Sequence, residues 1–146
     1  MLKATFFLDI GRAPEDVYRL VSNHENDVRW QASVARVVKL SAGPVRAGSR
    51  FRHTLQLLGV KIEAEIEIAE TRASDFHAFS IVGGPFVFDT CVSLQTSSLG
   101  TKVRTEIEGR AGGVTRLAAV TLSRIRRGEI ERDLQTLKRL MEAREL

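Results

Sequence analysis

The side chains best suited to chemistry in this sequence are three histidines and one cysteine. His24, His53 and His77 stand far apart along the 146-residue chain, and none belongs to an H-E-x-x-H zinc motif. Cys91 is the only cysteine, so no cysteine pair is available to bind a metal ion or to form an internal disulfide bond. The chain contains no G-x-S-x-G nucleophile elbow and no phosphate-binding glycine loop. We therefore expect no metal site and no cofactor.

His53 is the strongest single candidate for an acid–base role, because an alternating segment places it on a buried face. Phe51 and Leu55 flank it at a spacing of two, which puts all three side chains on one side of a strand. A neutral imidazole there can donate to a ligand carbonyl or exchange a proton near pH 7. Two structural roles fit the same pattern: a buried histidine bonded to a neighbouring group, or a histidine at an open sheet edge. No carboxylate partner is evident on the predicted inner faces.

The other candidate binding residues are mostly apolar and lie on predicted inner faces. Trp30, the only tryptophan, either lines the mouth of a cavity or plugs the end of a short helix. Phe86 and Phe88 belong either to a cavity wall or to a packed core, while Thr90 and Thr121 offer hydroxyl groups. The full candidate ligand-binding set is Trp30, Phe51, His53, Leu55, Ala64, Ile66, Phe86, Phe88, Thr90, Ala118, Thr121, Leu122 and Ile125.

Two alternating segments predict an antiparallel hairpin with one buried face and one solvent-exposed face. Residues 50–57 and 61–68 both alternate apolar with polar or charged side chains. Pairing them across residues 58–59 brings opposite charges together on the outer face, where each pair contributes roughly 0.2–1 kcal/mol. The predicted opposing pairs are Arg52–Glu65, Arg50–Glu67, Phe51–Ile66 and His53–Ala64.

The remaining pattern predicts further strands, an early helix and a long C-terminal helix. Pro14 suits the first position of a helix, and a polar stretch then leads to Trp30. Apolar residues at spacings of three and four predict one long helix from residue 114 to about residue 144. Such a helix must cover the face of a curved sheet. The apolar stripe is interrupted by a step of five from Ile125 to Ile130, so we expect the helix to bend or change its packing partner near Gly128. The alternative is a straight helix whose first half is buried nearly all round. The predicted strands outside the hairpin are residues 2–9, 33–40, 76–82, 86–94 and 103–107.

Composition predicts one ordinary globular domain over residues 1–146, because 43% of residues are hydrophobic and 27% are charged. The net charge of +4 comes without a basic block interleaved with aromatic residues, so we expect no nucleic-acid partner. No apolar run approaches the roughly 20 residues of a membrane span, and the N-terminus lacks the features of a secretory signal. We expect a cytoplasmic monomer or homodimer.

The order of these segments resembles the START/Bet v 1-like (SRPBCC) superfamily, in particular its polyketide cyclase/dehydrase-like bacterial members. The residues that carry the resemblance are 13–18 at the first helix, the stretch ending in Trp30, and segments 43–51, 100–103 and 133–138. The resemblance implies an α+β helix-grip fold. In that fold a seven-stranded antiparallel sheet wraps around the long C-terminal helix, and two short helices follow the first strand.

The resemblance also implies the class of function. Members of the superfamily typically bind or transport a hydrophobic small molecule, such as a lipid or a polyketide, in a cavity between the sheet and the C-terminal helix. We expect the same here, with that ligand as the partner. The alternative is a cyclase, aromatase or dehydratase that uses His53 as its acid or base and needs no metal or nucleotide cofactor. A third possibility is an interaction protein whose exposed sheet or helix binds another chain.

Overall fold

Alternating apolar residues and short turns divide the chain into strands that precede one long helix. The computed structural model describes residues 2–57, 59–83, 86–111 and 116–146, with side chains described outside residues 2, 57, 86 and 110–126. Within these ranges the chain forms seven strands, two α-helices and a 3-10 helix. They are β1 (Leu2–Ile10), α1 (Pro14–Ser22), η1 (His24–Arg29), β2 (Val34–Lys39), β3 (Arg50–Leu57), β4 (Val60–Arg72), β5 (Phe76–Gly83), β6 (Phe86–Ser97), β7 (Gly100–Ala111) and α2 (Arg116–Glu142).

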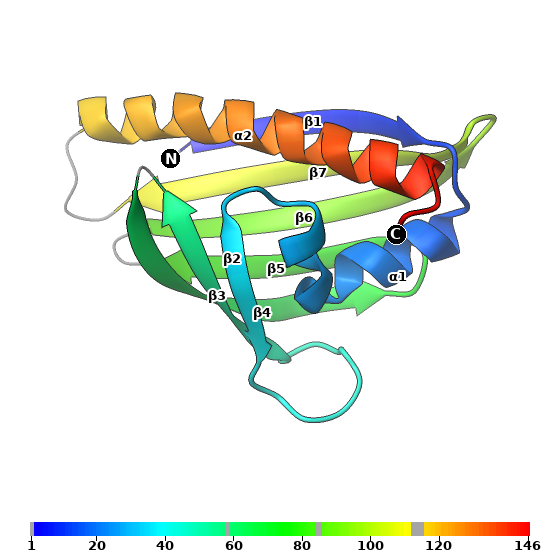
Figure 1. The fold of residues 1–146 in the computed structure, drawn as a ribbon, viewed down its shortest axis with the longest axis horizontal. Coiled ribbons are helices and arrows are strands. Elements are labelled where there is room, and N and C mark those ends of the chain that lie inside the picture. The colour runs from blue at the N-terminus through cyan, green and yellow to red at the C-terminus, as the bar shows by residue number, and fades with distance from the viewer. Residues whose placement is uncertain (1, 58, 84–85, 112–115) are drawn as a thin grey trace.

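All seven strands form one antiparallel sheet in the order β1-β7-β6-β5-β4-β3-β2. Helix α2 runs along the concave face of this curved sheet, and the short helices lie near the C-terminal half of α2 (Figure 1). The predicted α+β helix-grip architecture is therefore confirmed, including the two short helical segments after the first strand.

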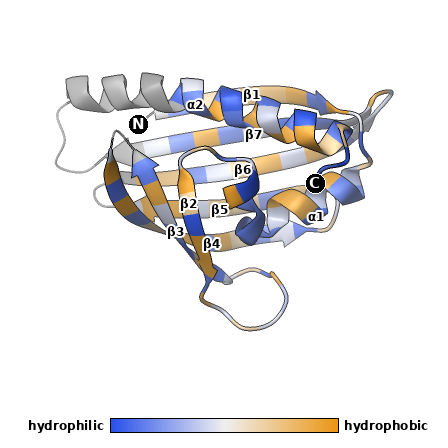
Figure 2. Ribbon diagram, in the orientation of Figure 1, coloured by the Kyte–Doolittle hydropathy of each residue, from blue (hydrophilic) through white to orange (hydrophobic). Residues whose placement is uncertain are grey.

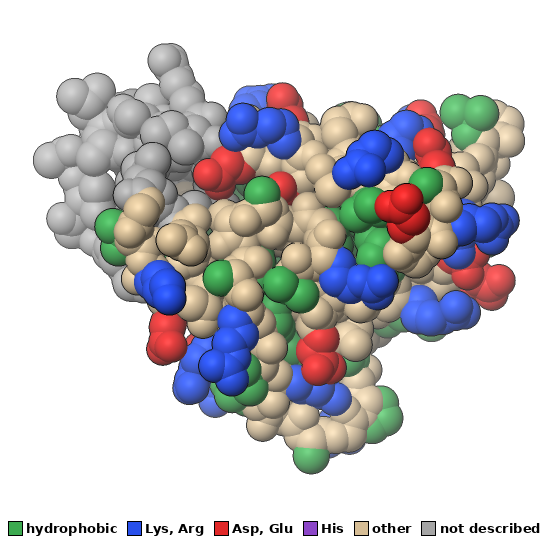
Figure 3. Space-filling model, viewed as in Figure 1, with side chains coloured by type: hydrophobic (Ala, Val, Ile, Leu, Met, Phe, Trp, Pro, Cys, Tyr) green, Lys and Arg blue, Asp and Glu red, His purple; other side chains and the backbone are tan. Residues whose placement is uncertain are grey.

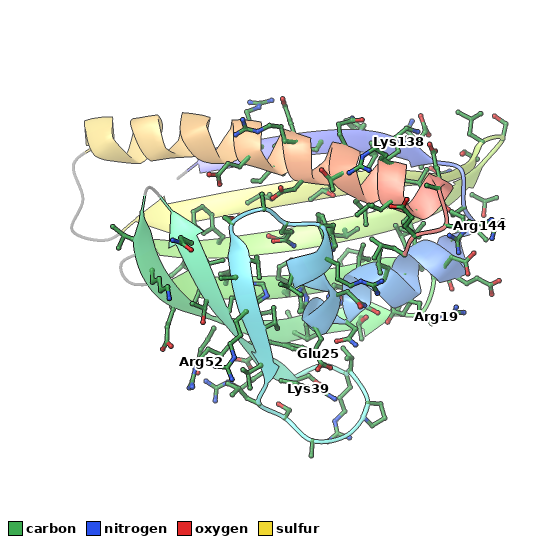
Figure 4. All side chains as sticks on the ribbon, viewed as in Figure 1. Arg19, Glu25, Lys39, Arg52, Lys138 and Arg144 are labelled. Atoms are coloured by element: carbon green, nitrogen blue, oxygen red, sulfur yellow. The ribbon has the colours of Figure 1, made fainter. Side chains whose placement is uncertain are left out.

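The predicted register of the β3–β4 hairpin is confirmed at all four pairs. Arg50 lies opposite Glu67, Phe51 opposite Ile66, Arg52 opposite Glu65 and His53 opposite Ala64. The ion pairing differs in one detail, because Arg50 reaches diagonally to Glu65 rather than straight across to Glu67. Arg52 also approaches Glu65, with 3.9 Å between Nη2 and Oε1. Figure 4 shows Arg52 on the outer surface of the sheet, as the alternation requires.

The largest part of the core lies between α2 and the strands at the β1 side of the sheet. Leu134, Leu137 and Met141 of α2 are buried, and Ile130 packs against the same cluster. These four residues form a stripe at helical spacing, so the apolar pattern of the second half of α2 directs it onto the sheet. Figure 2 shows apolar and polar residues alternating along the strands that α2 covers.

The surface carries charges of both signs. On the face shown in Figure 3, Lys and Arg side chains are interspersed with Asp and Glu. In the described part of the chain, no helix combines the length and the apolar character needed to cross a membrane.

Candidate functional site

A cavity lies between the sheet and α2. The space that the centre of a water molecule can occupy inside it is about 110 Å³. Most of its wall is apolar. Three polar side chains, those of His24, Asp27 and His53, converge where η1 meets β3, and further polar groups come from β6, β7 and α2. The lining residues are Val21, His24, Asp27, Trp30, Gln31, His53, Phe79, Ile81, Phe88, Thr90, Val92, Val103, Thr105, Ile107, Ile130, Asp133, Leu134 and Leu137.

Helix η1 brings two polar residues to the cavity wall. Its first turn is capped by Asn23, whose side chain accepts a hydrogen bond from the backbone of Glu25. Residues three apart are stacked along a 3-10 helix, so His24 and Asp27 share one face. Both are buried although η1 is a surface segment of mostly polar sequence. The 3-10 geometry of η1 therefore places an imidazole and a carboxylate side by side on the cavity wall.

Asp27 lies at the centre of a buried polar cluster. Its Oδ2 accepts a hydrogen bond from His24 Nδ1 at 2.8 Å. His53 Nε2, which reaches in from β3, lies 3.0 Å from the same oxygen, an ion-pair distance that lacks the alignment of a hydrogen bond. The side chains of all three residues are at most 3% exposed. The cluster therefore sits in a region of low dielectric constant, where electrostatic interactions are strong.

A chain of hydrogen bonds extends from this cluster toward α1. His24 Nε2 lies 3.0 Å from His77 Nε2 of β5, and His77 Nδ1 lies 3.1 Å from Thr71 Oγ1. The Thr71 hydroxyl in turn contacts the half-buried Tyr18 hydroxyl at 2.5 Å. The structure thus joins all three histidines of the sequence in one network.

Burial and neighbouring charges set the ionisation of this network. Burial opposes the charged form of Asp27, but electrostatic attraction to His24, the hydrogen bond from His24 and attraction to His53 together outweigh it, so the pKa of Asp27 is lowered. Burial and the proximity of His24 lower the pKa of His77 to about 3, although Asp27 opposes this shift. At neutral pH the site therefore holds an ionised Asp27 and an uncharged His77.

Several buried polar atoms at the site have no hydrogen-bond partner among the described residues. They are Asp27 Oδ1, His53 Nε2 and Trp30 Nε1. Buried polar atoms are almost always hydrogen bonded in native proteins. Three such atoms on one cavity wall indicate a position at which an additional polar group or ion can bind.

The structure brings four of the sequence-predicted site residues to the cavity. Trp30, His53, Phe88 and Thr90 all line it. The inward position of His53 agrees with the alternation of β3, and the half-buried Trp30 contributes to the wall next to η1.

Four other predicted binding residues lie in packed clusters beside the cavity. Leu55 and Ala64 pack with Val34, while Phe51 and Ile66 pack with Ile68. The Phe51 ring also contacts the His24 imidazole, with 5.3 Å between the ring centroids. Both clusters pack against Ile81, which lines the cavity, but the four residues themselves are not among those that line it. The remaining predicted residues, whose side chains lie outside the described residues, are Phe86, Ala118, Thr121, Leu122 and Ile125.

Sequence reasoning missed His24, Asp27 and His77. Their separation along the chain suggested that the histidines were unrelated, yet the fold places His24, Asp27 and His53 so that one ligand atom of each lies within 4.8 Å of the others. Asp27 also supplies the carboxylate that was not evident on the inner strand faces. The available signal was the H-x-x-D spacing directly after the first helix, which only a 3-10 conformation turns into a shared face.

Comparison with known proteins agrees with this architecture. The family profile described as "Polyketide cyclase / dehydrase and lipid transport" matches residues 1–142. No curated protein gave a match. Among solved structures, a START superfamily protein from Mycobacterium smegmatis is similar with a TM-score of 0.78 and 11% identity, over 95% of this chain and 98% of that one.

Two further solved structures share the fold at similarly low identity. Ara h 8.0201 has a TM-score of 0.69 and 11% identity, over 93% of this chain and 97% of that one. The di-domain ARO/CYC StfQ from the steffimycin biosynthetic pathway has a TM-score of 0.79 and 15% identity. That match covers 98% of this chain but 51% of StfQ, so the chain spans about half of the di-domain protein.

Proposed function

Because the chain belongs to the polyketide cyclase/dehydrase and lipid transport family, we propose that it binds or transports a hydrophobic small molecule, such as a lipid or a polyketide, in the cavity between the sheet and α2. The observation that carries this proposal is a cavity wall that is mostly apolar and holds a few polar groups, among them the cluster of His24, Asp27 and His53. Ligand sites typically combine apolar walls with a few convergent polar groups.

The composition of the wall also suggests how a ligand is oriented. Phe79, Phe88 and Val92 offer apolar surface for the body of the molecule. Burying that surface is favourable by roughly 25 cal/mol per Å² removed from water. Trp30 Nε1, a buried donor without a partner in the described residues, is available to a ligand oxygen. A hydrophobic molecule with an oxygen atom at one end fits these demands better than a pure hydrocarbon.

A fluorescent hydrophobic probe tests this proposal together with native mass spectrometry. Protein purified from its own host under non-denaturing conditions is expected to carry a co-purified hydrophobic molecule, and the delipidated protein is expected to bind an anilinonaphthalene sulfonate probe. Thr90→Leu places extra apolar volume in the cavity and should weaken probe binding about tenfold or more, the effect of about 1.4 kcal/mol. Thr96→Leu, at an exposed position of the same strand, is the matched control and should bind like the wild type. Equal binding by both variants would contradict a ligand site in this cavity.

A second candidate function is a cyclase or dehydratase in which His53 transfers protons. The observation that favours it is the buried Asp27 carboxylate 3.0 Å from His53 Nε2, because an acid–base histidine needs a group that orients it and stabilises its charged form. Such an enzyme would close a poly-β-ketone by an aldol step and release one water molecule in the dehydration. The test is the rate of water loss from a poly-β-ketone thioester, followed by mass.

The matched variants for this second candidate are His53→Gln and Thr96→Leu. General acid–base catalysis contributes typically 10²–10⁴-fold to rate, so His53→Gln should lower any accelerated rate by that factor while Thr96→Leu leaves it unchanged. Turnover by His53→Gln at the wild-type rate removes His53 as the acid or base.

A further inference from the structure

His24, Asp27 and His53 form a cluster of two imidazoles and one carboxylate that converge on a small volume of the cavity wall. We propose that this cluster binds one divalent first-row transition-metal ion, with His24 Nδ1, Asp27 Oδ2 and His53 Nε2 as its protein ligands. Two histidines and one carboxylate that leave other positions open are a characteristic donor set for such ions. The site assigns a function to a polar cluster that hydrophobic ligand binding alone does not require.

The two distances from Asp27 Oδ2 to the histidine nitrogens suit ligands of a single ion. Asp27 Oδ2 lies 2.8 Å from His24 Nδ1 and 3.0 Å from His53 Nε2. Two ligand atoms that each lie about 2.1 Å from one ion, at right angles, are about 3.0 Å apart. One candidate atom from each of the three residues lies within 4.8 Å of the others. The two oxygen–nitrogen distances therefore fit neighbouring positions of a six-coordinate ion more closely than the wider tetrahedral spacing. The two nitrogen atoms lie within 4.8 Å of each other, and both can bind one ion at about 2.1 Å only when they are no more than about 4.2 Å apart.

His24 Nδ1 donates a hydrogen bond to Asp27 Oδ2, and an ion bound there would replace that proton, which would be released to solvent. The geometry at His53 and at the second carboxylate oxygen is not that of a simple hydrogen-bonded set. Both histidines approach the same oxygen, Asp27 Oδ2, while Asp27 Oδ1 has no partner in the described part of the chain. Two histidines that only donated hydrogen bonds would be better satisfied by using both carboxylate oxygens. His53 Nε2 is close to Oδ2 but is not aligned for a hydrogen bond. A nitrogen whose lone pair is directed at a shared ion does not need that alignment.

An outer layer of hydrogen bonds holds the cluster in place. His24 Nε2, the nitrogen left over when Nδ1 binds an ion, lies 3.0 Å from His77 Nε2. His77 Nδ1 is held in turn by the Thr71 hydroxyl at 3.1 Å. Metal-binding histidines almost always donate their second ring nitrogen to such a partner, which fixes the ring orientation. In this inference His77 and Thr71 are positioning residues that act through His24.

The position of the cluster on the cavity wall predicts the ligand class. All three residues line the cavity, so an ion there can complete its coordination with an oxygen atom of the bound hydrophobic molecule, for example a carboxylate or a carbonyl. This ligand assignment rests on the proposed binding function, but the ion site itself does not. The inference competes with acid–base catalysis at His53, because a metal-bound Nε2 carries no proton to transfer.

Cobalt titration of the chelator-treated full chain tests the site. Calorimetry and visible absorption should give one Co²⁺ per chain for the wild type. Asp27→Asn and His53→Gln each remove a ligand and should weaken binding about 100-fold or more, whereas His77→Gln acts through His24 and should weaken it about 10–100-fold. Asp75→Asn is the control, because Asp75 is an exposed carboxylate that lies outside both the cavity and the cluster. It should bind Co²⁺ like the wild type.

A second measurement keeps the inference testable if a variant does not fold, which circular dichroism would reveal. In the wild type, paramagnetic Co²⁺ should broaden or shift the NMR signals of the three imidazoles before any others. The proposal is overturned if the wild type binds no Co²⁺, if folded Asp27→Asn and His53→Gln variants bind it as tightly as the wild type, or if Co²⁺ perturbs other regions first. Binding of the hydrophobic probe in the presence of chelator separates the two proposals, since it depends on the cavity and not on the ion.

Discussion

Adding one methylene group at Val92 tests whether the cavity is a true void in the core. Val92 is 8% exposed and lines the cavity. Val92→Ile adds a group smaller than a water molecule, which takes roughly 30 Å³ in the liquid, to a space of about 110 Å³. Burying one methylene is worth about 0.8 kcal/mol. The free energy of unfolding should therefore rise by about 0.8 kcal/mol, which corresponds to roughly 2–3 °C in Tm for a chain of this size.

The same substitution in a packed part of the core provides the control. Val17 of α1 is completely buried and is not among the residues that line the cavity. Val17→Ile forces a methylene into an occupied space and should lower the free energy of unfolding by about 1–3 kcal/mol. Urea unfolding of delipidated protein measures both values, provided that the two variants have the m-value of the wild type.

The two substitutions are therefore expected to change the free energy of unfolding in opposite directions. If Val92→Ile destabilises the chain as much as Val17→Ile, the space beside Val92 is not available to a side chain, and the cavity is not a void in solution. If Val92→Ile is stabilising, it should also weaken hydrophobic probe binding, because it occupies part of the same space.

Three further predictions concern the backbone and the thiol. Gly100→Ala should lower the free energy of unfolding by about 2–4 kcal/mol in a urea titration. Gly100 has a φ of +134°, and a Cβ there would lie 2.7 Å from the backbone nitrogen of Arg12. An unchanged free energy of unfolding would contradict this close approach. Gly128→Ala, where an added Cβ meets nothing within 4 Å, should raise stability by up to about 1 kcal/mol in the same assay, and a loss would show that the helix does not continue through this position. Burial, reinforced by nearby carboxylates, raises the pKa of the Cys91 thiol. Alkylation of Cys91 by iodoacetamide at pH 8 should therefore be slower than alkylation of the free amino acid and should accelerate only at higher pH. An alkylation rate above that of the free amino acid would contradict the raised pKa.

The fold was largely predictable because its strands have one buried and one exposed face. The hairpin of β3 and β4 illustrates this point. A slip of one residue would turn Phe51 outward and Arg52 inward, so the apolar pattern and the charges together select one register. The structure has that register. The diagonal contact from Arg50 to Glu65 was not predictable, since a long arginine side chain on an exposed face can reach more than one carboxylate.

The candidate site was only partly predictable. His53 was identified because its position within an alternating strand determines which face it occupies. Asp27 was missed because it lies in a short polar segment that has no apolar periodicity and reads as a surface loop. His77 was missed because the pattern of residues 76–82 does not show which side chains of that strand face inward. In the structure the His77 side chain is almost completely buried.

The sequence by itself determined the order of the elements, the hairpin register and the inward direction of His53, because each depends on local periodicity or on neighbouring segments. Only the tertiary structure decided that η1 packs over the inner face of the sheet and brings His24 and Asp27 to His53 and His77. Those contacts join residues 26 to 53 positions apart. They depend on how the curved sheet closes around α2 and the short helices, and a one-dimensional pattern of residues does not specify that closure.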